Sequence, residues 1–186
     1  MNYLAVYLAG KISKHGWRDK IVSHFPEDEY AETKVNGVIS CGPFFIACDH
    51  GCYHGDNSHG VGAYETGEEF PERCEGKGTP QALVPTVCTN QIDKSNFVFA
   101  YIDSDSCYGT LCEIGYAIGK NIPVAVMFSK KTLKRDMWFI AEIVNIVFNG
   151  CADMMKCEIK KKEIFFAAQN IADLIAGGDI EWESPS

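Results

Sequence analysis

The sequence predicts an α/β fold of the flavodoxin-like or Rossmann-like kind, an open parallel sheet of about five strands with helices on both faces. Apolar segments of strand length alternate along the chain with segments of helical periodicity, which is typical of this class. Two segments, residues 97–102 and 123–128, are continuous apolar runs. Such runs are expected of parallel strands that helices cover on both sides.

The individual elements follow from apolar periodicity and turn residues. Before the middle of the chain we expect a strand at residues 3–8, a helix at about 17–25 and a second strand at 35–40. Further along we expect a helix from Pro85 to about 94, the two apolar strands, and a last helix at 161–176 that ends at Gly177-Gly178. Residues 137–148 stay open between helix and strand, because periodicity does not distinguish short apolar runs.

Composition points to a single domain over residues 1–186 that acts on a small molecule. The chain is 46% hydrophobic, enough for a full core, and its net charge of −8 argues against duplex DNA or RNA as a partner. No apolar run approaches the ~20 residues of a membrane span, and no secretory segment opens the chain. The nine cysteines form an odd set, so we expect reduced thiols and a cytoplasmic location.

The loop and helix after the central strand are the most informative stretch. Asp103 and Asp105 follow the strand at 97–102, and a short amphipathic helix then carries Glu113 near its start. Ligands of open parallel sheets collect beyond the carboxyl ends of strands, so a carboxylate there is a candidate nucleophile. Thr110 and Glu113 also fit a capping box, in which both side chains bond to the first turn of the helix. Spacing alone leaves both interpretations open.

Three groups of residues match one known family. They are Tyr7-Leu-Ala-Gly10, Ser95-Asn-Phe-Val-Phe-Ala-Tyr101, and Gly109-Thr-x-x-Glu-Ile-Gly-Tyr-Ala117 followed by Gly119-Lys-x-x-Pro123. Together they resemble the nucleoside 2-deoxyribosyltransferase family, from about residue 3 to residue 128 with a gap in the middle. The motif from Gly109 to Ala117 is the most specific part of this resemblance.

The resemblance implies a mechanism, a site and an assembly. Glu113 would attack the anomeric carbon of a nucleoside, and Tyr7 would orient that carboxylate. A homo-oligomer, a dimer or larger, is also implied. The residues expected to bind the substrate are Gly10, Asp103, Asp105, Gly109 and Thr110, and the 103–110 loop is expected to form the ribose side of the pocket.

Glycosidic cleavage also needs a group that protonates the leaving base. The bond breaks through an oxocarbenium-like transition state that a carboxylate stabilises and then traps. Members of the family usually have an Asp at about the position of Cys88, so this chain must arrange protonation differently. Asp49 and His50 are the first candidates for the proton transfer, since an unperturbed His titrates near neutral pH.

A Cys/His/Gly-rich insertion loop is expected at about 41–79, and three interpretations of it stay open. The first is a zinc site made by Cys48, Cys52, His54 and His59, although their spacing matches no common zinc pattern. The second is a substrate lid in which His54 and His59 donate hydrogen bonds. The third is a plain loop with buried cysteines. Apart from the zinc alternative, no cofactor is expected.

We therefore expect an enzyme that cleaves the N-glycosidic bond of a nucleoside or nucleoside 5′-monophosphate, by base transfer or by hydrolysis. A glycohydrolase acting on a dinucleotide such as NAD is the alternative enzyme. A non-catalytic nucleotide sensor is the alternative from another class. Lys11, Ser13 and Arg18, after the first strand, are expected either to meet a phosphate or to form a solvated face.

Overall fold

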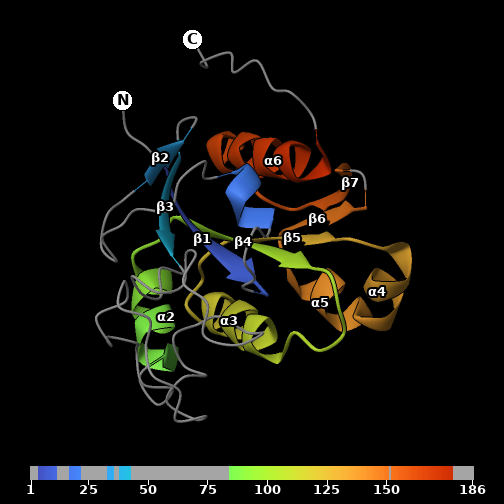
Figure 1. Ribbon diagram of the computed structural model, residues 1–186, viewed down its shortest axis with the longest axis horizontal. Helices are drawn as coiled ribbons and strands as arrows, with labels where there is room; N and C mark the ends of the chain where they lie inside the picture. Colours follow the sequence, from blue (N-terminus) through green and yellow to red (C-terminus); the bar gives the residue numbers. More distant parts are fainter. Residues whose placement is uncertain are drawn as a thin grey trace, which may run out of the picture.

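The structure is a computed structural model that describes residues 4–11, 17–21, 33–35, 38–42, 84–150 and 152–177. Within these ranges seven strands form one sheet, in the order β2-β3-β1-β4-β5-β6-β7 (Figure 1). The strands are β1 (Leu4–Gly10), β2 (Thr33–Val35), β3 (Val38–Gly42), β4 (Phe97–Ile102), β5 (Val124–Phe128), β6 (Ile146–Asn149) and β7 (Asp153–Cys157).

The predicted fold class is confirmed. The five central strands, β3-β1-β4-β5-β6, are all parallel to their neighbours, and an antiparallel strand borders each end of this group. Their order is that of flavodoxin-like folds, in which the chain moves to one side of β1 and then returns to the other. The switch point lies between β1 and β4, and ligands of such sheets bind at the carboxyl ends of the strands there.

Helices cover both faces of the sheet. In Figure 1, α2 and α3 lie below the sheet with α4 and α5 beside them, whereas α6 lies above it. The described helices are a short 3-10 helix η1 (Trp17–Lys20), α2 (Val84–Asp93), α3 (Tyr108–Gly119), α4 (Lys131–Asp136), α5 (Trp138–Ile143) and α6 (Lys162–Ala176).

The alternation of side chains along the strands divides the core in two. Tyr7 and Ala9 of β1 face the helices α2 and α3, while Val6 and Leu8 face η1 and α6. Every residue of β5 is buried, and β4 is buried except for the partly exposed Tyr101. Both strands therefore lie between two layers of helix, as their continuous apolar sequences predict.

Three predicted elements differ in the structure. The strand expected at 35–40 is two antiparallel strands, β2 and β3, and the residues between them in sequence, Asn36-Gly37, are a pair typical of hairpins. The ambiguous segment 137–148 contains both a helix, α5, and a strand, β6. The insertion loop cannot begin at residue 41, because Cys41 and Gly42 belong to β3; residues 43–79 lie outside the described part.

The remaining predicted helices are found close to their expected positions. The helix expected at 17–25 begins as η1 at Trp17, and the residues after Ile21 lie outside the described part. The last helix, α6, ends at Gly177, whose backbone is left-handed with a φ of 91°. A glycine adopts this conformation without steric cost, which explains the end of the helix.

Among the helices of the described ranges, none combines the length and the apolar character that crossing a bilayer requires. Four cysteines in these ranges, Cys88, Cys107, Cys112 and Cys157, have free thiols.

Candidate active site

A tyrosine and a glutamate far apart in sequence meet beneath the switch point of the sheet. Tyr7, in the middle of β1, is completely buried, and its hydroxyl donates a hydrogen bond of 2.5 Å to Oε1 of Glu113 on α3. Glu113 is only partly buried. A length of 2.5 Å lies at the short end of the range for an O–H donor to a carboxylate, which is the strong class of hydrogen bond.

The start of α3 decides between the two interpretations of Glu113. The helix begins at Tyr108, after an N-cap at Cys107 whose side chain makes no capping hydrogen bond. Thr110 is therefore the third residue of the helix and Glu113 the sixth, so Glu113 lies in the second turn. The capping-box interpretation is wrong, because the Glu113 carboxylate bonds to β1 instead of to its own helix.

Burial and three neighbouring groups shift the pKa of Glu113 in opposite directions. Burial raises the pKa of Glu113 above its usual value, while the Tyr7 hydrogen bond, the positive charge of Arg18 and the Cys88 thiol hold that pKa down. Burial and the nearby Glu113 charge raise the pKa of Tyr7 well above its usual range. Tyr7 therefore remains protonated and remains a donor to the carboxylate.

Cys88 occupies the place expected for an acidic residue. It lies on α2, is buried, and its thiol interacts with both Tyr7 and Glu113. Burial, followed by the Glu113 charge, raises the pKa of this thiol to about 12. The group next to the candidate nucleophile is thus a neutral thiol.

A polar contact outside the core joins the two helices that carry these residues. The Tyr116 hydroxyl of α3 donates to Asp93 of α2 at 3.0 Å, and Lys120 of α3 lies 3.4 Å from the same carboxylate. Asp93 therefore connects α2 to α3. This contact, together with the core between the helices, sets the position of Cys88 relative to Glu113.

Arg18 binds the backbone at the carboxyl end of β1. It is buried, and its guanidinium donates to the carbonyl oxygens of Leu8, Gly10 and Lys11 at 2.6–3.0 Å. Its guanidinium also lies 4.5 Å from the ring centre of Trp17. The prediction that Arg18 belongs to a solvated face is wrong. Arg is seldom buried, so no sequence pattern indicated this role.

Two glycines allow close packing at this edge of the sheet. Gly10 has a φ of 150°, and a Cβ there would lie 2.9 Å from the Tyr101 carbonyl oxygen and 3.1 Å from the Trp17 ring. Gly42, at the end of β3, also has a φ of 150°, and a Cβ there would meet the Tyr7 ring at 2.9 Å. Both positions therefore require glycine, and Gly42 leaves the space that the Tyr7 ring occupies.

The other predicted site residues surround the start of α3. Asp103 and Asp105 are exposed in the loop between β4 and α3, and no hydrogen bond within the described ranges joins them to Glu113. Gly109 has open space where a Cβ would stand, whereas Thr110 is buried. The structure thus brings these residues to the carboxyl end of β4, close in sequence to the helix that carries Glu113.

Six predicted site residues fall outside the described part of the chain. They are Asp49, His50, His54 and His59, with Cys48 and Cys52 of the zinc alternative also among the residues not described. Among the residues that the structure does describe, no group of three or more His, Cys, Asp or Glu side chains could hold a metal ion.

The described geometry can support attack by a carboxylate. One oxygen of Glu113 is held by a buried donor, and the edge of the sheet above it is the usual ligand position of this fold. Comparison with models of protein families and with curated proteins finds no match to the chain. The function must therefore be argued from the site itself.

Proposed function

We propose that the protein cleaves the N-glycosidic bond of a nucleoside or nucleoside 5′-monophosphate, with Glu113 as the nucleophile. The observation that supports the proposal is the hydrogen bond from Tyr7 to Glu113, which joins residues 106 positions apart. Burying the Glu113 carboxylate beside Tyr7 costs desolvation free energy, and the carboxylate does not cap its helix there. Orienting a nucleophile explains it.

The reaction has two steps. In the first, the Glu113 carboxylate attacks the anomeric carbon, the C–N bond breaks, and the base leaves with its electron pair and takes up a proton. In the second, water or a second base attacks the anomeric carbon of the glycosyl ester, and Glu113 leaves as a carboxylate. Tyr7 holds Oε1, so Oε2 is the oxygen proposed to attack.

Cys88 does not replace the acidic residue as the proton donor. A thiol whose pKa is about 12 is too weak an acid to protonate a leaving base efficiently near neutral pH. Its contribution is to lower the pKa of Glu113, which keeps more of the nucleophile ionised. Asp49 and His50 remain the proposed donors.

The experiment is a chromatographic assay of base release from a panel of nucleosides, 5′-mononucleotides and NAD. Each reaction runs with and without a second free base, beside Glu113→Gln and the control Glu163→Gln, which changes an exposed glutamate on α6. Base release that is lost only in Glu113→Gln supports the proposal. A new nucleoside that forms only with added base identifies a transferase, and release of nicotinamide identifies the dinucleotide alternative.

A non-catalytic nucleotide sensor is the second candidate, and the neutral Cys88 thiol beside Glu113 favours it. In a sensor, Glu113 would only complete a polar network with Tyr7. Glu113→Gln keeps an oxygen that accepts the Tyr7 hydrogen bond, so nucleotide binding would persist. Retention of binding without turnover by the unmodified protein would support the sensor.

Assembly and location are further proposals. We propose that the protein is a cytoplasmic homo-oligomer whose free thiols remain reduced. Light scattering during size-exclusion chromatography measures the mass of the assembly. A mass equal to the 20.6 kDa of one chain at all concentrations would contradict the oligomer.

A further inference from the structure

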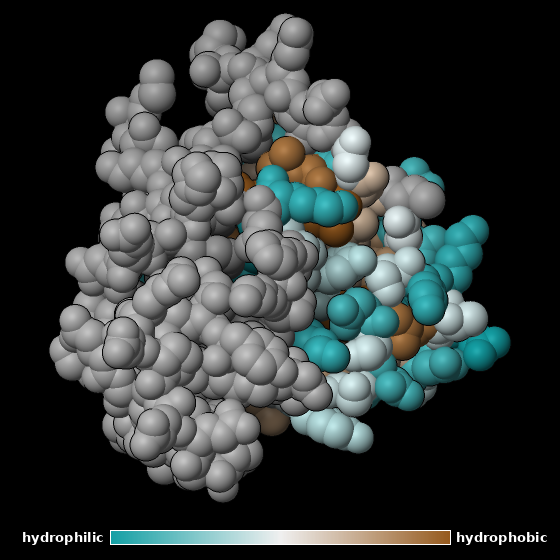
Figure 2. Space-filling view, in the orientation of Figure 1, coloured by the Kyte–Doolittle hydropathy of each residue, from teal (hydrophilic) through white to brown (hydrophobic). Residues whose placement is uncertain are grey.

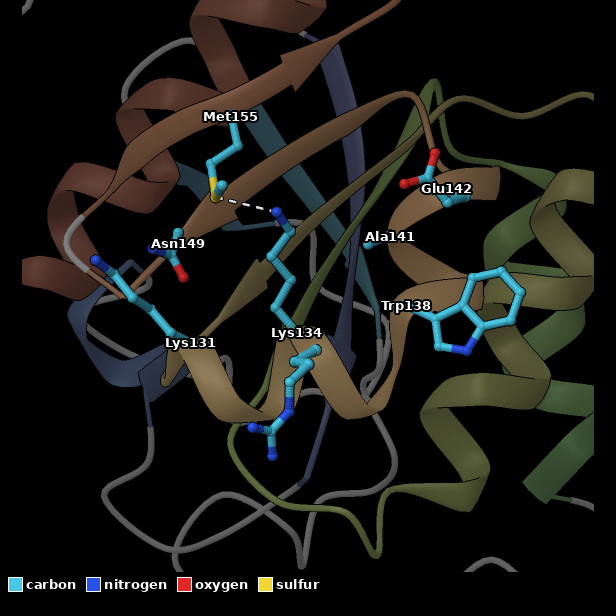
Figure 3. Close-up of a pocket in the computed structure, with 8 residues that line it drawn as sticks. Lys131, Lys134, Trp138, Ala141, Glu142, Asn149 and Met155 are labelled. Atoms are coloured by element: carbon cyan, nitrogen blue, oxygen red, sulfur yellow. Dashed lines mark hydrogen bonds between the residues drawn. The ribbon is translucent and has the colours of Figure 1, made fainter.

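A cavity lies at the other end of the sheet from Glu113. Its volume is about 420 Å³, within the range of small-molecule sites, and neither Tyr7, Cys88 nor Glu113 lines it. Helices α4 and α5 and strands β6 and β7 surround it (Figure 3). The lining residues that matter below are Lys131, Lys134, Arg135, Trp138, Glu142 and Asn149.

Positive charge gathers at this cavity although the chain carries a net charge of −8. Lys131, Lys134 and Arg135 all lie on α4, and Figure 2 shows hydrophilic side chains gathered over the edge of the molecule where Figure 1 places this helix. The one acidic lining residue, Glu142, lies 3.9 Å from Lys156. The field within the cavity is therefore positive.

The three cations have weak partners in the described part of the chain. The Lys134 ammonium donates to the thioether sulfur of Met155 at 3.3 Å, a poor acceptor for a charge (Figure 3). Arg135 pairs only with the exposed Asp136, its neighbour in sequence. Lys131 makes no hydrogen bond or ion pair with a described residue. An anionic ligand would thus meet cations that are still available.

Asn149 gives this cavity a second, independent mark of a ligand site. The residue is only 7% exposed, and its side-chain oxygen has no hydrogen-bond partner among the described residues. Figure 3 shows the Asn149 side chain between Lys131 and Lys134. Buried polar oxygens are nearly always paired, so the Asn149 amide, which lines the cavity, needs a polar partner that the described residues do not supply.

We propose that this cavity binds a phosphate monoester of a small sugar, free or as part of a nucleotide. The phosphate oxygens accept hydrogen bonds from Lys131, Lys134 and Arg135, and a sugar hydroxyl bonds to the Asn149 amide once that side chain turns toward the ligand. A bare inorganic anion satisfies only the first of these needs. The proposal does not depend on any reaction at Glu113.

Isothermal titration calorimetry with ribose 5-phosphate, adenosine 5′-monophosphate, ribose and inorganic phosphate tests the proposal. We compare the unmodified protein with the double variant Lys131→Met/Lys134→Met and with Asn149→Asp, which adds a negative charge. Lys160→Met, an exposed lysine outside the cavity, is the matched control. Circular dichroism establishes that each variant is folded.

The expected result is one bound ribose 5-phosphate, weakened at least about tenfold in both cavity variants and unchanged in the control. Ribose should not bind, and inorganic phosphate should bind more weakly than the ester. Variant-sensitive binding of adenosine 5′-monophosphate alone would support the site and identify a nucleotide as its ligand. Equal binding by the variants and the unmodified protein, no binding of either ester, or inorganic phosphate as tight as the esters would overturn the proposal.

Discussion

The two ends of the sheet differ in how their polar groups are satisfied. At the switch point, Glu113 meets a donor from Tyr7, the charge of Arg18 and the Cys88 thiol. At the other end, Asn149 has an oxygen without a partner in the described ranges, beside weakly paired lysines. In the proposed function, the first arrangement prepares a carboxylate for chemistry. In the second proposal, the partner of these groups comes with a ligand.

The largest effect expected is from Glu113→Gln, which removes the proposed nucleophile. Base release should fall at least about a thousandfold, because an amide does not form the glycosyl ester. Steady-state kinetics on the best substrate of the panel measures the loss, with Glu163→Gln as the control. Retained turnover in Glu113→Gln would end the assignment of Glu113.

The same substitution should stabilise the fold at neutral pH. Since burial raises the pKa of Glu113, the folded protein binds this proton more tightly than the unfolded chain does. The contribution of protonated Glu113 to the free energy of unfolding is therefore fully present below the pKa of the unfolded chain. It is lost as the pH rises through the pKa of the folded protein. Glu113→Gln should melt a few degrees higher than the unmodified protein at pH 8, and this difference should shrink toward pH 4. A lower melting temperature at both pH values would contradict the account.

Tyr7→Phe should have the next largest effect. It removes a hydrogen bond to a charged group, which corresponds to about a tenfold to hundredfold loss of turnover. It also removes the largest influence that lowers the pKa of Glu113, so the acidic limb of the pH profile should move to higher pH. A loss of turnover with an unmoved pH profile would mean that the Tyr7 hydroxyl orients the carboxylate without lowering its pKa.

Cys88→Ala should have a smaller effect of the same kind. The thiol is a weak donor, and its influence on the pKa of Glu113 is less than those of Tyr7 and Arg18. We expect roughly a twofold to fivefold loss of turnover and a smaller shift of the acidic limb than in Tyr7→Phe. A loss as large as that of Glu113→Gln would show that Cys88 takes part in the chemistry directly.

The smallest effect is expected at the other end of the sheet. Asn149→Leu replaces a buried amide whose oxygen has no described partner with an apolar side chain of similar size. Without ligand, the free energy of unfolding should stay unchanged or rise by about 1 kcal/mol. Urea denaturation in buffer without phosphate measures it. A loss of about 2 kcal/mol or more would mean that Asn149 is satisfied within the chain.

The sequence predicted the parts of the molecule that local patterns encode. Continuous apolar runs identified β4 and β5, and the apolar stripe of Leu111, Ile114 and Ala117 identified the helix that carries Glu113. The sequence did not predict the start of that helix, because no capping residue marks it. The N-cap residue is Cys107, whose side chain packs in the core. The short elements α4 and β7 were missed for a related reason, since their residues are largely exposed.

The two candidate sites also differ in how much of each the sequence predicts. Family-like motifs named Tyr7 and Glu113, which are 106 positions apart in sequence, yet no pattern indicated the buried Arg18. The cavity beside α4 draws its lining from four consecutive short elements, all within residues 131–155. Its character depends on how the sheet brings Asn149 beside α4, and residue spacing does not encode that.

Intact-mass spectrometry tests the central claim most directly. The protein is mixed with a nucleoside whose 2′-fluorine slows the second step, quenched with acid, weighed, and digested to locate any adduct. The account predicts a mass gain of one fluorinated glycosyl unit, carried by the peptide that contains Glu113 and absent from Glu113→Gln. Base release without an adduct, or an adduct that persists in Glu113→Gln, would contradict it.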